Sequence, residues 1–358
     1  MQGIRGIMRK MKFKFMTIIA LFAMLMILPS CKKSSLIQNA LVPEPAIKPD
    51  FVMHIGHAQT EESPRHRSLL MFKAKVEELT EGKVSVEIFS NGMIGDETMM
   101  TNAVSEGKLE AVRGGDLEFV PKAMLLGLPM IADSLVDARK LCYSNFVRDM
   151  LSAAEEKNMM VLAVGDDSGF RQITNSVHPI VTPQDLKGLK IRAPQIVTTV
   201  DFFNELGSEV TVVPFTELYA ALAIGIVSGQ ENPLALIDSS KFYEIQKYCT
   251  IIDYQFFPEL MFINLDWWNS LPSNYQSILA SCAKKMMFAN AKITDEENEA
   301  YIEHIKANGC DVLTLTKEQR AAFFPYAERV WKKFIDDGYA TEDELEQILK
   351  IIGKSLEW

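Results

Sequence analysis

Residues 273–307 read SNYQSILASCAKKMMFANAKITDEENEAYIEHIKA, a stretch of 35 residues without proline or glycine. Its apolar residues recur in steps of three and four, the period of one helix face: Tyr275, Ile278, Leu279, Cys282, Met286, Ala289 and Ile293. Asn308-Gly309 ends the pattern. A single helix of this length would span about 50 Å, more than the diameter of a small domain. We therefore expect it to run across two lobes; the alternative is two shorter helices that break near Thr294-Asp295.

Outward from this segment, strand-like and helix-like patterns alternate. Residues 83–89 read KVSVEIF, and such alternation of apolar and polar side chains indicates a half-buried strand. Residues 64–80 repeat apolar side chains at helical spacing instead. Another helix is predicted at 96–107, and the remaining strands are predicted at 50–56, 109–112, 161–164, 190–192, 209–213 and 254–257. Strands separated by helices predict an α/β protein with mainly parallel strand pairing.

Composition narrows the class of protein. The chain has 358 residues, of which 48% are hydrophobic and 23% charged, enough apolar mass for one large domain or two of ordinary size. These proportions exclude a disordered chain, a collagen-like repeat and a disulfide scaffold. The formal net charge is −10, and beyond residue 14 there are 32 basic and 47 acidic residues. We expect no nucleic-acid partner, because binding phosphates requires many lysines and arginines.

The N-terminus has the pattern of an export signal. Residues 1–14 hold five positive charges, and the uncharged residues 15–28, FMTIIALFAMLMIL, are too short to span a bilayer. The following Leu-Pro-Ser-Cys resembles a bacterial lipoprotein cleavage box, so we predict a signal peptide over 1–30 and a lipid on Cys31. Ordinary cleavage and an uncleaved anchor are the alternatives. The mature protein is then expected to be periplasmic or otherwise extracytoplasmic and tethered to the membrane, with the proline-containing residues 31–49 as the tether.

The other cysteines do not indicate a metal or redox site. Cys142, Cys249, Cys282 and Cys310 are far apart in the sequence and form no Cys-x-x-Cys motif. One disulfide or four buried thiols are both compatible with this spacing. A His-x-x-His sequence ends at His57, but residues three apart on a strand lie on opposite faces. We expect no bound metal and no other cofactor.

Several blocks of sequence, taken in order, carry a family resemblance. They are EGKVSVEIFSNGMIGDE (81–97), GFRQITNS (169–176), DLKGLKIRAPQ (185–195), VPFTELYAAL (213–222), GQENPLA (229–235) and KFYEIQKY (241–248). In this order they resemble the extracytoplasmic solute-binding proteins of TRAP transporters, the DctP type. The resemblance covers about residues 50–310, and although each block is weak by itself, their common order makes a chance match implausible.

The resemblance implies a two-lobed, periplasmic-binding-protein-like α/β fold, with a long helix spanning both lobes and a ligand cleft between them. We expect lobe I at 50–168 plus about 257–295, and lobe II at 169–256 plus about 296–358. Proteins of this family are not enzymes: they close on an organic acid and deliver it to a sodium-driven TRAP permease. The implied partners are a small organic acid (a C4-dicarboxylate, a sugar acid or a similar carboxylate), the permease subunits, and the membrane through the lipid on Cys31. We expect a monomer.

Arg192 is the residue predicted to hold the ligand's carboxylate. It ends the strand-like LKIR directly before an Ala-Pro pair, and open α/β sheets bind ligands at strand ends. A guanidinium donates two parallel hydrogen bonds to a carboxylate, a geometry that lysine lacks. By resemblance, Arg192 is the family's carboxylate-binding arginine. Arg171, in a predicted loop between the lobes, resembles a second cleft arginine; alternatively it is a surface charge paired with Asp166 or Asp167.

The resemblance adds further candidates for ligand contacts. Asn232 of GQENP offers a donor and an acceptor on one amide and would contact the carboxylate or a neighbouring hydroxyl. Phe215 matches an aromatic ring that stacks over the ligand. Gln195 and Glu97 would reach hydroxyl or amine groups, and His57 lies where the family's first loop enters the cleft.

Arg113 belongs to the stretch LEAVRGGD, residues 109–116. We expect its two glycines to leave room for a ligand to approach. Arg113 would then be a third anion contact, which would favour a dicarboxylate or a sugar acid. The stretch departs from that of the sialic-acid binders, which carry larger polar groups there, so sialic acid is disfavoured.

Two other functions fit parts of the sequence. GDDSG, residues 165–169, places acids beside a serine, but it is not the Gly-x-Ser-x-Gly elbow of hydrolases, and adjacent aspartates more often cap a turn. The same two-lobed fold would also serve a ligand-sensing lipoprotein that docks on a receptor kinase. The sequence favours transport over both and does not name the acid.

Overall fold

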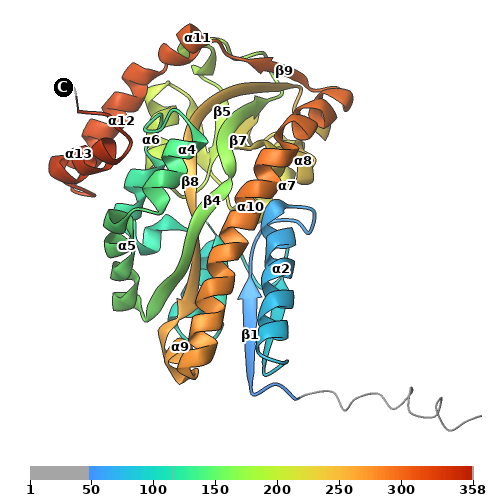
Figure 1. Ribbon diagram of the computed structural model, residues 1–358. Helices are drawn as coiled ribbons and strands as arrows, with labels where there is room; N and C mark the ends of the chain where they lie inside the picture. The colour runs from blue at the N-terminus through green and yellow to red at the C-terminus, as the bar shows by residue number, and fades with distance from the viewer. Residues whose placement is uncertain (1–47, 115, 357–358) are drawn as a thin grey trace, which may run out of the picture. The chain divides into compact units, whose positions relative to one another are not determined.

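The computed structural model describes residues 48–114 and 116–356, in which one sheet is layered with helices (Figure 1). The strands are β1 (Phe51–Gly56), β2 (Val84–Phe89), β3 (Ala111–Gly114), β4 (Met159–Asn175), β5 (Lys190–Ala193), β6 (Glu209–Val212), β7 (Gly229–Pro233), β8 (Tyr248–Asn264) and β9 (Asp311–Thr314). Their order in the sheet is β2-β1-β3-β8-β4-β7-β5-β6, with β9 paired to β8. The predicted α/β class is confirmed.

Helices connect these strands and cover the sheet. The α-helices are α2 (Pro64–Leu79), α3 (Glu97–Ser105), α4 (Leu135–Cys142), α5 (Asn145–Leu151), α6 (Val197–Glu205), α7 (Phe215–Ala223), α8 (Leu234–Ser239), α9 (Leu265–Ser270), α10 (Ser273–Ala307), α11 (Lys317–Ala321), α12 (Phe324–Asp336) and α13 (Glu342–Ile351). The 3₁₀ helices are η1 (Leu117–Phe119), η2 (Pro121–Gly127), η3 (Ser152–Lys157), η4 (Pro183–Leu186) and η5 (Phe242–Glu244).

Two long antiparallel strands join the two lobes. β4 and β8 have 17 residues each and pair along most of their length. On one side β3 continues the sheet to β1 and β2, which with it form the strands of the first lobe; on the other side β7 continues to β5 and β6, the strands of the second lobe. Parallel pairing, predicted for most of the sheet, holds for β1 with β2 and β3, for β5 with β6 and β7, and for β8 with β9. The pairs β3 with β8, β4 with β7 and β4 with β8 are antiparallel, and the last is the longest ladder of the sheet.

The two long strands extend well beyond the predicted segments 161–164 and 254–257. β8 is buried along nearly its whole length, so its side chains do not alternate between apolar and polar. β4 carries three register shifts against β8, which interrupt any regular period. Arg171, predicted in a loop, lies in β4, because the strand resumes after the irregularity between Asp166 and Phe170.

The long helix is one unbroken element. α10 comprises 35 residues, so the alternative of two helices that break near Thr294-Asp295 is wrong. It packs on α2 and β4 and continues along α8 and β9, which Figure 1 shows as it crosses beside β4. Met286 and Met287 belong to the core of the first lobe, whereas Tyr301 and Ile305 belong to that of the second.

Apolar side chains form three buried clusters. One lies under α2 and α10 in the first lobe, and one lies around α7 and α8 in the second. The largest includes Phe202 and Tyr254, whose rings stack at 5.1 Å between centroids, and extends to α12 and α13. There the indole Nε1 of Trp331 donates to the carbonyl of Pro129 at 2.8 Å. Of the two possibilities left open for the cysteines, the structure has buried thiols at Cys142, Cys249, Cys282 and Cys310.

Gly229 permits the close approach of three strands in the second lobe. It begins β7 and pairs with Asn175 of β4 and Ile191 of β5. A Cβ at this position would lie 2.7 Å from the carbonyl oxygen of Thr174 and 2.8 Å from Cδ1 of Ile191. The backbone oxygen cannot move aside without breaking the sheet.

We therefore expect Gly229→Ala to lower the free energy of unfolding by about 1–3 kcal/mol, the usual cost of overpacking a core. Urea unfolding followed by circular dichroism measures the change. Ser228→Ala is the matched control, because Ser228 is the preceding, partly exposed residue. A stability of Gly229→Ala equal to that of the wild type would show that the sheet adapts at this point.

Candidate functional site

A cavity of about 280 Å³ lies where the two lobes meet. Segments that follow parallel strands build much of its wall: Gln59 follows β1, Asp116 follows β3, Gln195 follows β5 and Pro214 follows β6. The carboxyl ends of parallel strands are the usual ligand site of α/β sheets, because loops from several strands converge there. Side chains of β4, β7 and β8 line the cavity between the lobes.

Six of the eight predicted ligand residues line this cavity, and these are Arg192, Arg171, Asn232, Phe215, Gln195 and Glu97. Residues distant in the sequence therefore meet at one place. Their contacts with a ligand stay a prediction. His57 and Arg113 lie outside the lining.

Arg192 is a buried cation whose charge is not neutralised by an acidic side chain within ion-pair distance among the described residues. It lies in β5, as predicted, and only 2% of it is exposed. Its Nε donates to the carbonyl of Val213 at 2.8 Å, and its terminal nitrogens make no hydrogen bond with the described part of the chain. Burial lowers its pKa to about 10, with the charge of Arg171 acting in the same direction and that of Glu231 against it. The guanidinium is thus held in place at Nε, and its two terminal nitrogens are available to an anion.

Arg171 is bound to a carboxylate of the second lobe. Its Nε and Nη2 donate to the two carboxylate oxygens of Glu231, and its guanidinium lies 4.5 Å above the ring of Phe257. Burial acts to lower its pKa, but the charge and hydrogen bonds of Glu231 raise it overall. Nη2 also donates to Oδ1 of Asn232 at 2.9 Å, and Nδ2 of Asn232 donates to Gln230 at 2.5 Å. Arg171 and Asn232 therefore form a preorganised wall of the cavity.

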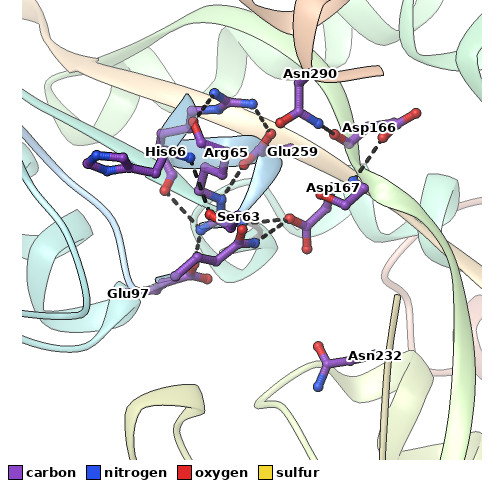
Figure 2. Close-up of polar contacts among 12 residues, drawn as sticks. Ser63, Arg65, His66, Glu97, Asp166, Asp167, Asn232, Glu259 and Asn290 are labelled. Atoms are coloured by element: carbon purple, nitrogen blue, oxygen red, sulfur yellow. Dashed lines mark hydrogen bonds and ion pairs between the residues drawn. The ribbon is translucent and has the colours of Figure 1, made fainter. Parts of the chain in front are cut away.

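On the first-lobe side, Arg65 is the centre of a buried ion cluster (Figure 2). Its Nη1 lies 2.5 Å from Glu97, its Nη2 lies 2.7 Å from Asp167, and its Nε pairs with Glu259. Burial acts to lower the pKa of Arg65, but these carboxylates raise it overall. Figure 2 shows Asn232 on the other side of the open space from this cluster.

Arg113 belongs to the same cluster rather than to the cavity wall. It is fully buried, and its Nη2 lies 2.5 Å from Glu259 while its Nη1 donates to Ser68 at 2.7 Å. Gly114, which follows Arg113, does leave space beside the backbone, but the side chain of Glu97 occupies that space. A Cβ on Gly114 would lie 2.9 Å from the carboxyl carbon of Glu97. We infer that Arg113 holds Glu259 in place and acts on the cavity through Arg65.

His57 is a buried, neutral side chain. Its Nε2 lies 3.0 Å from Nδ1 of His66, and burial, together with the charge of Arg65, lowers its pKa to about 2. No group of three or more metal-ligating side chains occurs within the described ranges.

The remaining predicted residues lie at the rim. Phe215 begins α7 and packs edge-on against Phe242 at 6.2 Å between centroids. Nε2 of Gln195 donates to Glu118 at 3.2 Å, which connects the loop after β5 to η1 of the first lobe. This hydrogen bond connects the two lobes at the rim of the cavity.

Asp116 is the one strongly perturbed acid in the described cavity lining. It is 8% exposed and follows β3. Burial raises its pKa to about 7, and the neighbouring carboxylates of Glu97 and Glu118 act in the same direction, against hydrogen bonds from Thr98 and the Glu118 amide. A carboxyl group of this kind is divided between its neutral and ionised forms near neutral pH.

Sequence reasoning missed four buried polar residues of the cavity lining: Gln59, Arg65, Asp116 and Asp167. A signal existed for Arg65, which precedes the apolar residues Leu69, Phe72 and Val76 by four, seven and eleven positions and so shares their buried helix face. An arginine on an apolar face needs buried acidic partners. Gln59, Asp116 and Asp167 lie in irregular backbone, where no repeating pattern predicts the direction of a side chain.

Adjacent Asp166 and Asp167 have separate structural roles. The carboxylate of Asp166 accepts hydrogen bonds from the amides of Ser168 and Gly169 at 2.8 and 3.2 Å, and pairs with Arg139 at 2.6 Å. It therefore caps the irregular turn of β4, the role expected for adjacent aspartates.

The chain matches the profile of DctP, bacterial extracellular solute-binding protein, family 7, over residues 55–337. It is similar to the 2,3-diketo-L-gulonate-binding periplasmic protein YiaO of Escherichia coli strain K12, with 28% identity over 265 residues, 73% of this chain and 80% of the relative. The C4-dicarboxylate-binding periplasmic protein DctP of Rhodobacter capsulatus is 28% identical over 285 residues, 78% of this chain and 85% of the relative. A TRAP periplasmic solute-binding protein from Polaromonas sp. JS666, solved with D-erythronate, matches with a TM-score of 0.79 and 26% identity, over 86% of this chain and 100% of that one. These matches confirm the family resemblance and the two-lobed fold.

The raised pKa of Asp116 predicts a pH-dependent stability. Between the pKa of an exposed aspartate and about 7, the folded protein keeps a proton that the unfolded chain has lost, so stability falls as pH rises. Asp116→Asn removes this fall in stability, because an amide does not titrate. We expect its advantage over the wild type in unfolding free energy to grow by about 2 kcal/mol between pH 5 and 8 and to level off above pH 7.

Urea unfolding at four pH values measures this difference. Asp149→Asn is the control, because it makes the same change at an exposed residue that does not line the cavity. An advantage of Asp116→Asn that did not change with pH would mean that Asp116 titrates normally.

Proposed function

The chain belongs to family 7 of the bacterial extracellular solute-binding proteins, the DctP family, and we propose that it captures an organic acid and delivers it to a sodium-driven TRAP permease. Proteins of this family bind solutes and are not enzymes, and TRAP solute-binding proteins are periplasmic. In the part of the chain that the structure describes, no helix combines the length and apolarity needed to cross a membrane, the 35-residue α10 included.

One observation carries the proposal: Arg192 presents terminal guanidinium nitrogens, unpaired among the described residues, to a cavity between two lobes. A buried cation without an acidic partner is costly, and an incoming carboxylate removes that cost while accepting two parallel hydrogen bonds. Asn232, held by Arg171, adds an oriented amide to the same wall. The relatives named above support an organic acid as the ligand, because each is described with a carboxylate or a sugar acid.

We further propose that the lobes close around the ligand, with the predicted boundaries of 50–168 plus about 257–295 and 169–256 plus about 296–358. The irregular turn of β4 supports a hinge near the first boundary, since Ser168 and Gly169 have φ values of 75° and 95°. Hinges commonly absorb such backbone changes at a few positions where regular structure is interrupted.

Transport is favoured over the alternatives. A ligand-sensing lipoprotein would use the same closure, but the two relatives are described as periplasmic binding proteins and the similar solved structure as a TRAP periplasmic solute-binding protein. For a hydrolase, the predicted serine and acids of GDDSG are not arranged as a catalytic set, because Asp166 binds backbone amides and Asp167 binds Arg65.

We expect Arg192→Ala to abolish measurable binding, because losing one partner of a buried charge pair costs about 2–5 kcal/mol, roughly thirty-fold to several-thousand-fold in affinity. A thermal-shift screen of organic acids identifies the ligand first; at 100 times its dissociation constant it adds about 2.7 kcal/mol of stability. Calorimetry then compares the wild type with Arg192→Ala, Arg192→Lys and Arg171→Ala. Arg192→Lys keeps the positive charge but loses the planar guanidinium that donates two parallel hydrogen bonds, so it is expected to bind the ligand clearly more weakly than the wild type.

Arg148→Ala is the matched control, since Arg148 is exposed, does not line this cavity and donates a hydrogen bond to Asn145 at 2.8 Å. The melting temperature of Arg192→Ala without ligand is expected to equal or exceed that of the wild type, because a buried, unneutralised charge is removed. Wild-type affinity in Arg192→Ala would refute the site, and wild-type affinity in Arg192→Lys would leave Arg192 a role of charge alone.

We also propose that Cys31, which lies outside the described residues, carries a lipid that tethers the protein to the membrane. Cys31→Ser is expected to release the protein from the membrane fraction or to block removal of the signal peptide. Fractionation and intact-mass measurement check both results. A single acyl chain anchors only marginally, so the mass of the wild type should correspond to at least two chains. An unchanged mass and an unchanged membrane fraction in Cys31→Ser would exclude lipidation.

A further inference from the structure

The first half of β4 has a neighbouring strand on one side only. Residues 159–166 pair with β8, whereas the pairing of β4 with β7 on its other side begins at Arg171. No described strand pairs with residues 159–166 on the side away from β8. A free strand edge presents backbone N–H and C=O groups with which another extended chain can pair. This stretch of β4 can therefore accept a further strand.

The sequence of this edge does little to protect it. Natural proteins commonly guard an exposed edge with lysine or proline, but residues 160–164 read MVLAV. All five side chains are partly exposed. A register shift against β8 between Val161 and Ala163 distorts the edge without adding a charge to it. The result is an apolar strand edge that is partly open to solvent.

A cavity of about 550 Å³ lies along this edge, and we call it the edge groove. Residues 160–164 line it, together with Leu151 of α5, Glu155 of η3, and Ala280 and Phe288 of α10. Figure 1 shows this half of β4 between α5 and α10. The edge groove shares no described lining residue with the cavity between the lobes. Consecutive side chains of a strand point to opposite faces, so a cavity lined by all five residues lies at the edge of the strand.

Both walls of the edge groove are apolar. Val161 and Val164 pack against the largest core cluster, which includes residues of α5. Met160, Leu162 and Ala163 pack against the first-lobe cluster under α10. A further strand beside β4 would direct its alternate side chains toward these same two walls. The edge groove therefore has the position and the lining of a strand that the described chain does not supply.

An extended peptide is the occupant that fits this site. The five residues of the edge span about 16 Å, and the volume lies within the usual range of about 300–1,000 Å³ for ligand sites. In β-strand addition, main-chain hydrogen bonds supply affinity, and pockets for alternate side chains supply specificity. A small apolar molecule would fill the space between the walls but would leave the backbone groups at the edge of β4 unpaired.

The charged side chains of the edge groove favour an acidic peptide. Among the described lining residues they are Arg148 on α5 and Lys284 on α10, which are exposed, and Glu155. The lining thus has a net positive charge, whereas the whole chain has a formal net charge of −10. We propose that the edge groove binds an extended apolar segment of a partner protein, flanked by acidic residues, as an added strand beside β4. This inference goes beyond the proposed function, because it involves neither Arg192 nor the cavity between the lobes.

A fluorescein-labelled peptide of sequence EVLVTVE with an amidated C-terminus tests the proposal. Fluorescence polarisation is expected to show saturable binding to the wild type. Methylating alternate backbone nitrogens removes the N–H donors from one edge of the peptide. Methylation of one alternate set is therefore expected to weaken binding about tenfold or more, and methylation of the other set to leave it unchanged. The peptide KVLVTVK is expected to bind more weakly than EVLVTVE, with a difference that shrinks as salt is added.

Variants of the protein locate the bound peptide. Ala280→Trp fills the edge groove and is expected to abolish binding; Ser281→Trp is the matched control, because Ser281 is exposed and does not line the groove. Lys284→Glu is the second variant if Ala280→Trp does not fold, and it is expected to weaken binding of EVLVTVE and to strengthen that of KVLVTVK. Lys285→Glu is its control, because Lys285 is an exposed lysine outside the lining. The peptide is also expected to slow hydrogen exchange at the amides of residues 160–164.

Several results would overturn the proposal. They are a lack of saturable binding of EVLVTVE, unchanged binding in both Ala280→Trp and Lys284→Glu, and equal binding of the two methylated peptides and the unmethylated one. Dodecanoate that displaced the peptide and bound more tightly would replace the partner protein with a lipid-like molecule. A dimer of the wild type that Ala280→Trp abolished would replace it with a second copy of this chain. Arg192→Ala is expected to bind the peptide as the wild type does, so the proposed function is tested separately.

Discussion

The antiparallel pairing of β4 with β8 is the constraint on which the rest of the structure depends. These strands are the only path of the described sheet from β3 in the first lobe to β7 in the second. Their ladder is also irregular where the cavity lies, with a register shift between Asp166 and Phe170. Because a bulge redirects side chains, the shift lets Asp167 and Arg171, four residues apart on one strand, bind partners in different lobes.

Buried carboxylates explain why several arginines are tolerated around one small cavity. Removing a guanidinium from water is costly unless carboxylates replace the lost hydration. Arg65 and Arg113 share Glu259, and Arg171 binds Glu231, so these three cations are compensated within the protein. Arg192 is the exception among the buried arginines described, and its lowered pKa expresses the same cost. The protein thus leaves one charge to be neutralised from outside.

The sequence predicted the fold well where periodicity was regular. The apolar side chains that recur at helical spacing in 273–307 correctly predicted all of α10. The alternation of apolar and polar side chains in 83–89 predicted β2 to within one residue. The strand end predicted at Arg192 was located within one residue, because a proline follows it closely. The length of β4, the inclusion of Arg171 in it and the burial of Arg113 against Glu259 could not be predicted, because each depends on contacts between segments more than 50 residues apart.

The arginines around the cavity differ in how firmly the protein itself holds them. On the first-lobe side Arg65 pairs with Glu97, Asp167 and Glu259, and on the second-lobe side Arg171 binds Glu231 and Asn232. Among the buried arginines described, Arg192 alone is held at a single nitrogen, by the carbonyl of Val213. Any carboxylate can complete such a site, so Arg192 cannot by itself distinguish one acid from another, and selectivity must come from the other polar side chains of the lining.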